Sequence, residues 1–355
     1  MTFLSHRNLL CPFCLHALRP ARQERACPQC RRPIPPVYLR EARELQPLPI
    51  QAIGWSSHGK SVYLAALTLL LTRMGVVWPG YCWASGSDET QRSVEMVNRH
   101  LDEGTLPPST PLGTDQASLL LMRGMERWDG RALVYCDCAG ELFDGMSIPV
   151  DQVLFLLQAR TTFLIVSPED LMAQRQRTVD MLLNGFRSTL ESNRIDPARE
   201  RRRVVVVLTK GDLLVDLPAS LYRYLVDDRC WRALDQRAAD WAFTGVAIDR
   251  YLEGMRRVDG EIRDWVMTDP GGRNLVKLAA DAELDLRFSI VSATGGPVLD
   301  GRLEDRWHPR RVIDPLIWAL EFSSSRFRIT DDAAAHPRSR PRFTIQSRQR
   351  SKRLP

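Results

Sequence analysis

The segment Gly54-Trp55-Ser56-Ser57-His58-Gly59-Lys60-Ser61 matches the G-x-x-x-x-G-K-S pattern of a phosphate-binding loop. Its glycines let backbone N–H groups turn onto a polyphosphate, and a following helix would add the positive end of its dipole. Lys60 is predicted to bring a positive charge to the β- and γ-phosphates, and the Ser61 hydroxyl to bind Mg²⁺. A Gly/Ser-rich loop that merely precedes a helix is the alternative. The predicted nucleotide contacts of this loop are Ser57, His58, Gly59, Lys60, Ser61 and Val62.

A second motif, Asp137-Cys138-Ala139-Gly140-Glu141, follows the apolar stretch 131–136. An acidic residue at the end of such a strand is placed to bind Mg²⁺ directly or through water, so Asp137 is the predicted carboxylate. Gly140, three residues later, can turn its N–H onto a γ-phosphate. An ordinary turn containing an Asp is the alternative, and the phosphate-binding loop upstream argues against it.

The tetrapeptide Thr209-Lys210-Gly211-Asp212 follows the clearest strand pattern, 203–208, and predicts which base is bound. The Asp212 carboxylate can accept hydrogen bonds from N1–H and the exocyclic amine of guanine, a pair that adenine does not offer, while the stem of Lys210 covers the base. The wrong base would leave a desolvated carboxylate unpaired, so such a site prefers GTP. A solvent-exposed turn is the alternative. Further guanine contacts are predicted from the backbone of Ser292, Ala293 and Thr294, which follow a strand pattern at 286–291.

The proline-rich loop 104–111 is predicted to supply a threonine to the same site. In nucleotide switches such a threonine contacts Mg²⁺ and the γ-phosphate. Thr110 is the preferred residue, with Thr105 and Thr114 behind it. A plain surface turn explains the loop equally well.

Two C-x-x-C pairs, Cys11 with Cys14 and Cys27 with Cys30, are separated by twelve residues. Four thiolates with this spacing are typical of tetrahedral Zn²⁺. Residues 1–32 are too few to form a hydrophobic core, so a metal would have to stabilise them. Four protein ligands leave no open position, which predicts a structural or docking role. Disulfide pairing is the alternative, and the absence of a secretion signal argues against it.

The hydrophobic patterns predict the elements that position these motifs. A buried strand at 48–53 precedes the phosphate-binding loop and a helix at 62–71 follows it. Strands and helices alternate from there onward, which predicts an α/β P-loop NTPase fold with a doubly wound, mostly parallel sheet. The other expected elements are a linker at 33–49, strands at 81–84, 161–166, 203–208 and 286–291, helices at 94–101, 168–193 and 314–322, and a hairpin joining 117–122 to 131–136 through Asp129-Gly130. The expected divisions are a zinc ribbon at 1–40, a GTPase domain at 41–325 with a helical insertion at about 213–285, and a basic disordered tail at 326–355.

The net charge of +6 is unevenly distributed along the 355 residues. Seven arginines against Glu24 make 1–40 basic, and nine Lys/Arg against two Asp make 326–355 basic, so the body at 41–325 is acidic. Basic ends can attract nucleic acid or anionic lipid, although a solvated tail is the simpler interpretation. The longest apolar run, 63–71, is about half of the roughly 20 residues of a membrane span. We therefore expect a cytoplasmic protein.

Taken in order, GWSSHGKS, the loop threonine, DCAGE, TKGD and SATG resemble the motifs of Ras-like, translation-factor-related GTPases, over about residues 48–296. The cysteine-rich ribbon, the loop Leu106-Pro107-Pro108-Ser109-Thr110 and D-x-x-G-E resemble more narrowly the bacterial double-GTPase families of conflict and defence systems. The resemblance implies binding of GTP and GDP with Mg²⁺, slow hydrolysis, and a switch read by a protein effector or regulator.

Three positions depart from the pattern of these relatives. Thr209 stands where Asn is usual, which removes an amide that braces the phosphate-binding loop, although a Thr hydroxyl can partly substitute. Glu141 stands where many relatives place a water-orienting Gln; a carboxylate there could orient or deprotonate water but would repel an unshielded γ-phosphate. His58 replaces a small or apolar residue, and either touches the γ-phosphate or packs.

Three functional hypotheses follow from the sequence. The first is a GTPase switch in which Lys60, Thr110, Gly140 and Glu141 act on the γ-phosphate and the attacking water. The second is a non-hydrolysing GTP sensor that recruits an effector through its ribbon and tail. The third is an RNA- or ribosome-associated GTPase that uses its basic ends.

Overall fold

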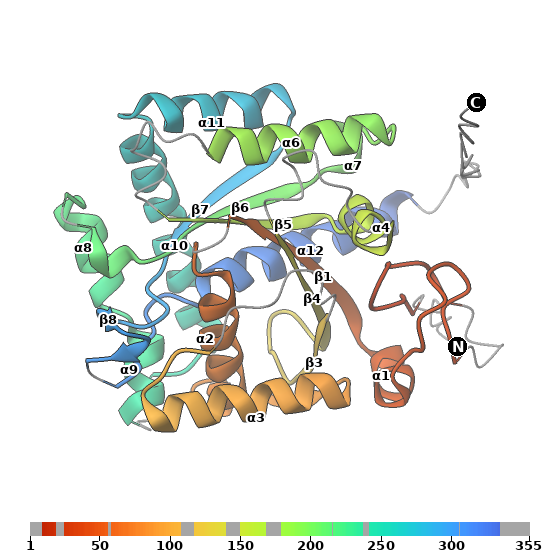
Figure 1. The fold of residues 1–355 in the computed structure, drawn as a ribbon, viewed down its shortest axis with the longest axis horizontal. Coiled ribbons are helices and arrows are strands. Elements are labelled where there is room, and N and C mark those ends of the chain that lie inside the picture. Colours follow the sequence, from red (N-terminus) through yellow and green to blue (C-terminus); the bar gives the residue numbers. More distant parts are fainter. Residues whose placement is uncertain are drawn as a thin grey trace, which may run out of the picture.

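The computed structural model describes residues 9–18, 25–55, 58–107, 117–139, 150–167, 179–214, 216–236, 241–304 and 306–333. Within them, seven strands form one sheet in the order β2-β3-β4-β1-β5-β6-β7 (Figure 1). Strands β4, β1, β5, β6 and β7 run parallel to one another, and β3 is antiparallel to both of its neighbours. The strands are β1 (Gln46–Gly54), β2 (Cys82–Ser85), β3 (Ser118–Arg123), β4 (Arg131–Ala139), β5 (Thr161–Val166), β6 (Arg203–Leu208) and β7 (Asp285–Ile290). The predicted mostly parallel α/β sheet is confirmed.

Helices cover both faces of this sheet (Figure 1). Helices α2 and α12 lie against one face, while α6 and α11 lie against the other. The helices are α1 (Pro36–Glu41), α2 (Lys60–Arg73), α3 (Asp88–Glu103), α4 (Val150–Gln158), α6 (Val179–Ser192), α7 (Pro197–Glu200), α8 (Ala219–Val226), α9 (Arg229–Gln236), α10 (Gly245–Val266), α11 (Pro270–Asp281) and α12 (Asp314–Ala333), with short 3-10 turns η2 (Ala42–Glu44), η3 (Met74–Val76) and η5 (Gly211–Leu213).

The side chains of the central strands divide between two buried layers with the period of two that a strand imposes. In β4, Leu133 and Tyr135 join a first core cluster with α2 and α12, while Cys138 joins a second core cluster with α6 and α11. Strands buried on both faces carry continuous apolar runs, so apolar and polar residues do not alternate along them in the sequence.

The N-terminal cysteine-rich segment, together with α1 and α4, covers one face of β3 and β4. Leu119 and Leu121 of β3 and Val134 of β4 point away from the first core cluster and pack in a third cluster with Leu15 and Tyr38. We call this third group the ribbon cluster; it also contains Phe155 and Ala159 from α4 and the turn after it. The cysteine-rich segment therefore forms part of a core layer.

The predicted linker at 33–49 is ordered along most of its length. It contains α1, η2 and the start of β1, and the Tyr38 hydroxyl donates a hydrogen bond of 2.8 Å to the carbonyl of Leu10. Pro47 and Pro49 lie in the part of β1 that pairs only with β4, since pairing with β5 begins at Ile50. A proline cannot donate to a ladder, so it suits a stretch of strand with one neighbour.

A buried arginine fixes the C-terminal end of α4. Arg202, 1% exposed, donates to the carbonyls of Leu156 at 3.1 Å and Ala159 at 2.8 Å, and also to the carbonyl of Leu157. These carbonyls have no partner within a helix, so the guanidinium satisfies several of them at once. Burial lowers the pKa of Arg202, and the neighbouring Glu200 carboxylate opposes that effect.

The predicted insertion at 213–285 is helical and contains α8 to α11. Helix α10 packs along β7 and contributes to both layers, its first half to the first core cluster and its second half to the second. A buried polar group joins this insertion to α12: the carboxylate of Asp314 accepts hydrogen bonds from the hydroxyls of Tyr224, at 2.6 Å, and Tyr251. The insertion is thus packed into the body of the protein.

Several predicted boundaries shift in the structure. The helix predicted at 314–322 runs on to Ala333, so the basic tail expected from 326 begins inside α12, and 334–355 lie outside the described residues. The sparse apolar content beyond 323 argued against independent burial, but it does not prevent further helical turns. The predicted helix 168–193 is described as α6 from Val179, and the strand at 81–84 and the hairpin through Asp129 are confirmed. No helix in the described part of the chain is both long and apolar enough to span a bilayer.

Candidate functional site

The predicted motifs meet at one edge of the sheet because they follow parallel strands. Gly54, at the end of β1, pairs with Ala139 of β4, and Val166, Leu208 and Ile290 end β5, β6 and β7 at matching register. The loops that leave these carboxyl ends share one edge, where α/β sheets bind their ligands.

The phosphate-binding loop connects β1 directly to α2, as predicted. Gly59 has a left-handed backbone with φ of 80°, and a Cβ on Gly54 would lie 2.6 Å from the Ile165 carbonyl oxygen, so both positions require glycine. The Lys60 ammonium donates to the carbonyls of Gly54 at 2.7 Å and Trp55 at 3.1 Å. The lysine charge therefore lies over the end of β1, beside the N-terminus of α2.

His58 packs inside the protein. It is 4% exposed, and its Nδ1 lies 3.0 Å from the carbonyl oxygen of Ile165 in β5. Of the two possibilities in the sequence, packing is the one that this geometry favours.

Thr209 connects the guanine motif to the phosphate-binding loop. Its hydroxyl donates to the His58 carbonyl at 2.8 Å and to the Val166 carbonyl at 3.1 Å. A Cβ on Gly59 would lie 3.8 Å from the Thr209 hydroxyl oxygen, so the two loops are in contact. The Thr209 hydroxyl thus connects to the phosphate-binding loop, as expected if it substitutes for the amide of the usual Asn.

Asp212 lies in η5, directly after β6. Lys210 adopts a left-handed backbone with φ of 55°, and the Gly211 N–H donates to the Val291 carbonyl at 3.0 Å, which joins this turn to β7. The Oδ1 oxygen of Asp212 is buried and has no hydrogen-bond partner among the described residues. A buried carboxylate oxygen without a partner is costly, so its geometry fits a ligand that donates to it, as the edge of guanine does.

The loop after β7 is held in place by the segment before α12. Ser292 and Arg310 exchange backbone hydrogen bonds of 3.1 and 2.7 Å, and the His308 N–H donates to the Thr294 carbonyl at 2.8 Å. Gly295, with φ of 83°, approaches so closely that a Cβ would lie 2.1 Å from the His308 carbonyl oxygen. Ala293 is buried, and the Ser292 hydroxyl accepts from the Gly295 N–H at 2.8 Å.

Among the predicted Mg²⁺ ligands, Ser61 and Asp137 are the two that lie within the described residues. Ser61 is in the first turn of α2, and Asp137 is level with Ala52 in the neighbouring strand, so both belong to the same edge. A hydroxyl and a carboxylate are ligands that Mg²⁺ prefers. The remaining predicted residues of the γ-phosphate side, Ser57, Thr110, Thr114, Gly140 and Glu141, lie outside the described residues.

Thr105, an alternative for the switch threonine, is engaged elsewhere. Its hydroxyl lies 2.8 Å from Nδ1 of His100, and its backbone forms an antiparallel bridge with Arg302. This arrangement makes it part of a structural turn at the end of α3 and favours a residue beyond 107 for the role.

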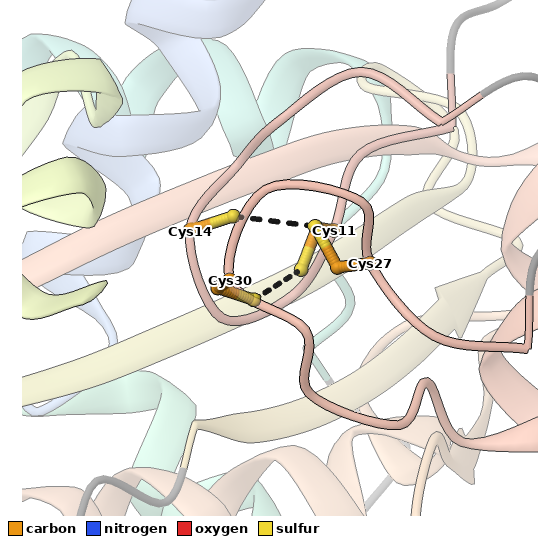
Figure 2. A group of neighbouring side chains, drawn as sticks. All are labelled: Cys11, Cys14, Cys27 and Cys30. Atoms are coloured by element: carbon orange, nitrogen blue, oxygen red, sulfur yellow. Dashed lines mark hydrogen bonds between the residues drawn. The ribbon is translucent and has the colours of Figure 1, made fainter. Parts of the chain in front are cut away.

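The four N-terminal cysteines form a second candidate centre (Figure 2). The ligand atoms of Cys11, Cys14, Cys27 and Cys30 lie within 4.8 Å of one another. The sulfur atoms of Cys11 and Cys30 are 3.7 Å apart and those of Cys14 and Cys27 are 3.6 Å apart. A tetrahedron with Zn–S bonds of about 2.3 Å has edges of about 3.8 Å, so the thiol positions fit Zn²⁺.

The backbone around these cysteines repeats itself. Cys11 and Cys27 each accept a 3.4 Å hydrogen bond at sulfur from the N–H two residues later. Each pair is followed by a left-handed residue, Leu15 with φ of 57° and Arg31 with φ of 61°. The hydrogen bond between the Cys11 and Cys14 side chains lowers the pKa of Cys14 to about 5 and raises the pKa of Cys11, so the thiol of one residue stabilises the thiolate of the other. Two equivalent knuckles facing one another are the expected form of a zinc ribbon.

A family model for Double-GTPase 2 matches residues 48–251, more than half of the chain. The chain belongs to the Double-GTPase 2 family. None of the curated proteins compared with it matches. Among solved structures it is similar to one described as sup35 complexed with GDP, at 14% identity, 75% coverage of this chain and a TM-score of 0.27. It spans 42% of the length of that chain.

The Double-GTPase 2 match begins at β1 and ends within α10. It includes the phosphate-binding loop, Asp137 and the turn containing Asp212. The loop after β7 and the segment that fastens it lie beyond the matched residues, as does the ribbon. Sequence reasoning missed one neighbour of this loop, the hairpin β8 (Val298–Leu299) and β9 (Arg302–Leu303), although its Asp300-Gly301 turn carries the same signal that revealed the hairpin at Asp129.

Proposed function

We propose that this Double-GTPase 2 protein binds GTP and GDP and hydrolyses GTP as a Mg²⁺-dependent switch. The observation that carries the proposal is the hydrogen bond from Thr209 to the His58 carbonyl. It joins the turn 209–212, which we call the base-reading turn, to the phosphate-binding loop in one site. The buried Oδ1 of Asp212 supports guanine as the base.

Each residue of the edge has a defined role in this proposal. The Asp212 carboxylate accepts from N1–H and the exocyclic amine of guanine, while the Lys210 stem covers the base and the loop 292–294 contacts the guanine oxygen. Lys60 exchanges its carbonyl partners for the β- and γ-phosphate oxygens, beside the backbone amides of the loop and the helix dipole.

Hydrolysis is assigned to the γ-phosphate side of the site. Ser61, Asp137 and Thr110 would hold Mg²⁺, which neutralises phosphate charge when bound. Glu141 orients the attacking water and the Gly140 N–H contacts the γ-phosphate, so that water attacks in line with the leaving oxygen.

Titration with fluorescent GTP and ATP analogues, with and without Mg²⁺, tests the binding site. We expect a strong preference for GTP, loss of that preference in Asp212→Ala, and loss of binding to either nucleotide in Lys60→Ala. Asp216→Ala, on an exposed neighbour, is the matched control. Equal binding of ATP and GTP by the wild-type protein would overturn the guanine assignment.

Single-turnover hydrolysis of GTP tests the second half of the proposal. Replacing Glu141 with Ala should slow the step by about 10²-fold or more with little change in GTP affinity, while Glu141→Gln should retain part of the rate. Tight GTP binding without turnover, with and without partner proteins, would favour the sensor hypothesis over the enzyme.

We also propose four properties of the protein outside its nucleotide site. These are a cytoplasmic location, a protein effector or regulator, a role in a bacterial conflict or defence system, and contact with nucleic acid through the basic ends. The four thiolates of the ribbon would hold Zn²⁺ in a closed structural site.

A further inference from the structure

The β8–β9 hairpin connects two loops that are far apart in the sequence. It follows the guanine loop 292–295 after only two residues, Gly296 and Pro297. Its second strand then pairs with the end of α3: the Leu303 N–H donates to the Gly104 carbonyl at 2.9 Å, and the Leu106 N–H donates to the Gly301 carbonyl at 3.0 Å. The hairpin lies beside the C-terminal end of α3 (Figure 1).

The geometry of the hairpin makes this connection stiff. Asp300 and Gly301 both have positive φ, 49° and 75°, as in the tight two-residue turn that matches the twist of paired strands. Leu303 and Leu106 are partly buried against the first core cluster. The paired segment is therefore held by backbone hydrogen bonds and by apolar contact.

The other end of the connection is equally constrained. The guanine loop is fastened by Arg310 and His308, and the Thr294 hydroxyl donates to the Gly296 carbonyl at 2.9 Å. A change in the guanine loop must be absorbed by the two residues at 296–297 or passed to the hairpin. On the far side, residues 104–107 lead into the loop that carries Thr110.

We propose that the β8–β9 hairpin is a positioning element that couples occupation of the guanine loop to the segment 104–107. This inference rests on the proposed GTP-binding function and adds a regulatory connection to it. Guanine binding further restricts the motion of 292–295, the hairpin transmits this restriction to the strand that it pairs with at 104–106, and the entrance to the threonine loop is held in place before any γ-phosphate contact. Leu303 and Leu106 are the positioning residues, since their N–H groups make the connection.

Hydrogen exchange tests the coupling directly. The amide of Leu106, which donates to the Gly301 carbonyl, is followed in the full-length protein with GDP in a Mg²⁺-free buffer without chelator, so that the ribbon keeps its metal and no γ-phosphate reaches the threonine loop. In the wild-type protein we expect GDP to slow exchange of this amide by about tenfold or more.

Two variants remove the pairing between the hairpin and 104–106, and a control variant shows whether a change in the hairpin alone alters the protein. Leu303→Pro removes the donor to Gly104, and replacement of 298–303 by Gly-Ser-Gly removes the whole hairpin; Leu299→Ala, on the 61% exposed hairpin residue, is the control. In both variants GDP should still bind, while its effect on the Leu106 amide is lost; the control should behave as the wild type.

Failure of the coupling and failure of nucleotide binding give different results in this experiment. No slowing by GDP in the wild type, or full slowing in either variant that binds GDP, overturns the coupling and leaves GTP binding intact. Failure of the wild type to bind GDP at all contradicts the proposed function, and the coupling with it. A Leu303→Pro variant that does not fold leaves the hairpin replacement as the deciding test.

Discussion

The Thr209 hydroxyl is the smallest feature of this protein with a consequence for the whole site. It reaches the His58 carbonyl across 2.8 Å and is shared with the Val166 carbonyl, so a single side chain joins the base-reading turn, the phosphate-binding loop and β5. A hydroxyl donates one proton, whereas the Asn usual at this position carries an amide with two.

Replacing Thr209 with Val should therefore weaken binding of both GDP and GTP. The variant keeps the shape of the side chain and removes the hydroxyl that donates to the His58 carbonyl, at a cost of about 1 kcal/mol or roughly fivefold in affinity. Equilibrium titration with a fluorescent GDP analogue measures the effect. Thr209→Ser restores the hydroxyl and should bind as the wild type; equal binding by all three proteins would show that the contact is irrelevant to the site.

The sequence proposes residues for this site because their types are dictated by ligand chemistry. Lys60, Asp137 and Asp212 were assigned from motifs, and the structure brings their strands to one edge of the sheet. The resemblance also implies that the Thr209 hydroxyl can brace the phosphate-binding loop, but no local pattern identifies its partner, the His58 carbonyl, 151 positions away. The packing of His58 could not be decided from sequence for the same reason.

At the scale of elements, the ribbon behaves as a layer of the core. Its apolar residues and α1 cover the outer face of β3 and β4, a place that a helix covers elsewhere in this sheet. The cysteine spacing predicted a metal-bound module, but the module was expected at the end of a linker. The spacing of the cysteines identifies the metal ligands and nothing about the surface against which the ribbon packs. That surface, the apolar outer face of β3 and β4, can be recognised only once the strand order is known.

Removal of the metal should consequently destabilise the entire body. Chelation, or Cys14→Ser, would loosen the ribbon cluster and expose apolar side chains of β3 and β4; a loss of about 3 kcal/mol lowers the midpoint of thermal unfolding by roughly 4 °C in a chain of this length. Fluorescence of Trp78 and Trp128, which lie in the first core cluster on the opposite face, reports the effect. Cys82→Ser, at an exposed position, is the control; an unchanged tryptophan transition after chelation would contradict the shared core.

At the scale of the whole molecule, Asp314 ties the helical insertion to the closing helix. It is 2% exposed, accepts from Tyr224 and Tyr251, and lies near Arg311, whose guanidinium stacks 3.7 Å over the Tyr224 ring, and near Asp228. Burial raises the pKa of Asp314 to about 6, against the opposing effects of Arg311 and the tyrosine hydroxyls.

The raised pKa predicts a specific pH dependence of stability. The folded protein binds the Asp314 proton more tightly than the unfolded chain does, so this group's contribution is complete below about pH 4 and is lost as pH rises through about 6. The loss is on the order of 3 kcal/mol. The free energy of urea unfolding of wild type relative to Asp314→Asn should fall by about that amount between pH 4 and pH 7. The exposed Asp264→Asn should show no such trend, and a difference independent of pH would refute the assignment.

The ribbon cluster also restricts how this protein can change through descent. In a relative that lost the four cysteines, Leu119, Leu121 and Val134 would be exposed to solvent, and a solvent-exposed apolar strand surface promotes aggregation. Loss of the cysteines should therefore be accompanied in surviving relatives either by another apolar segment over β3 and β4 or by polar residues at these three positions. The cysteines and a face of two distant strands are expected to be inherited together.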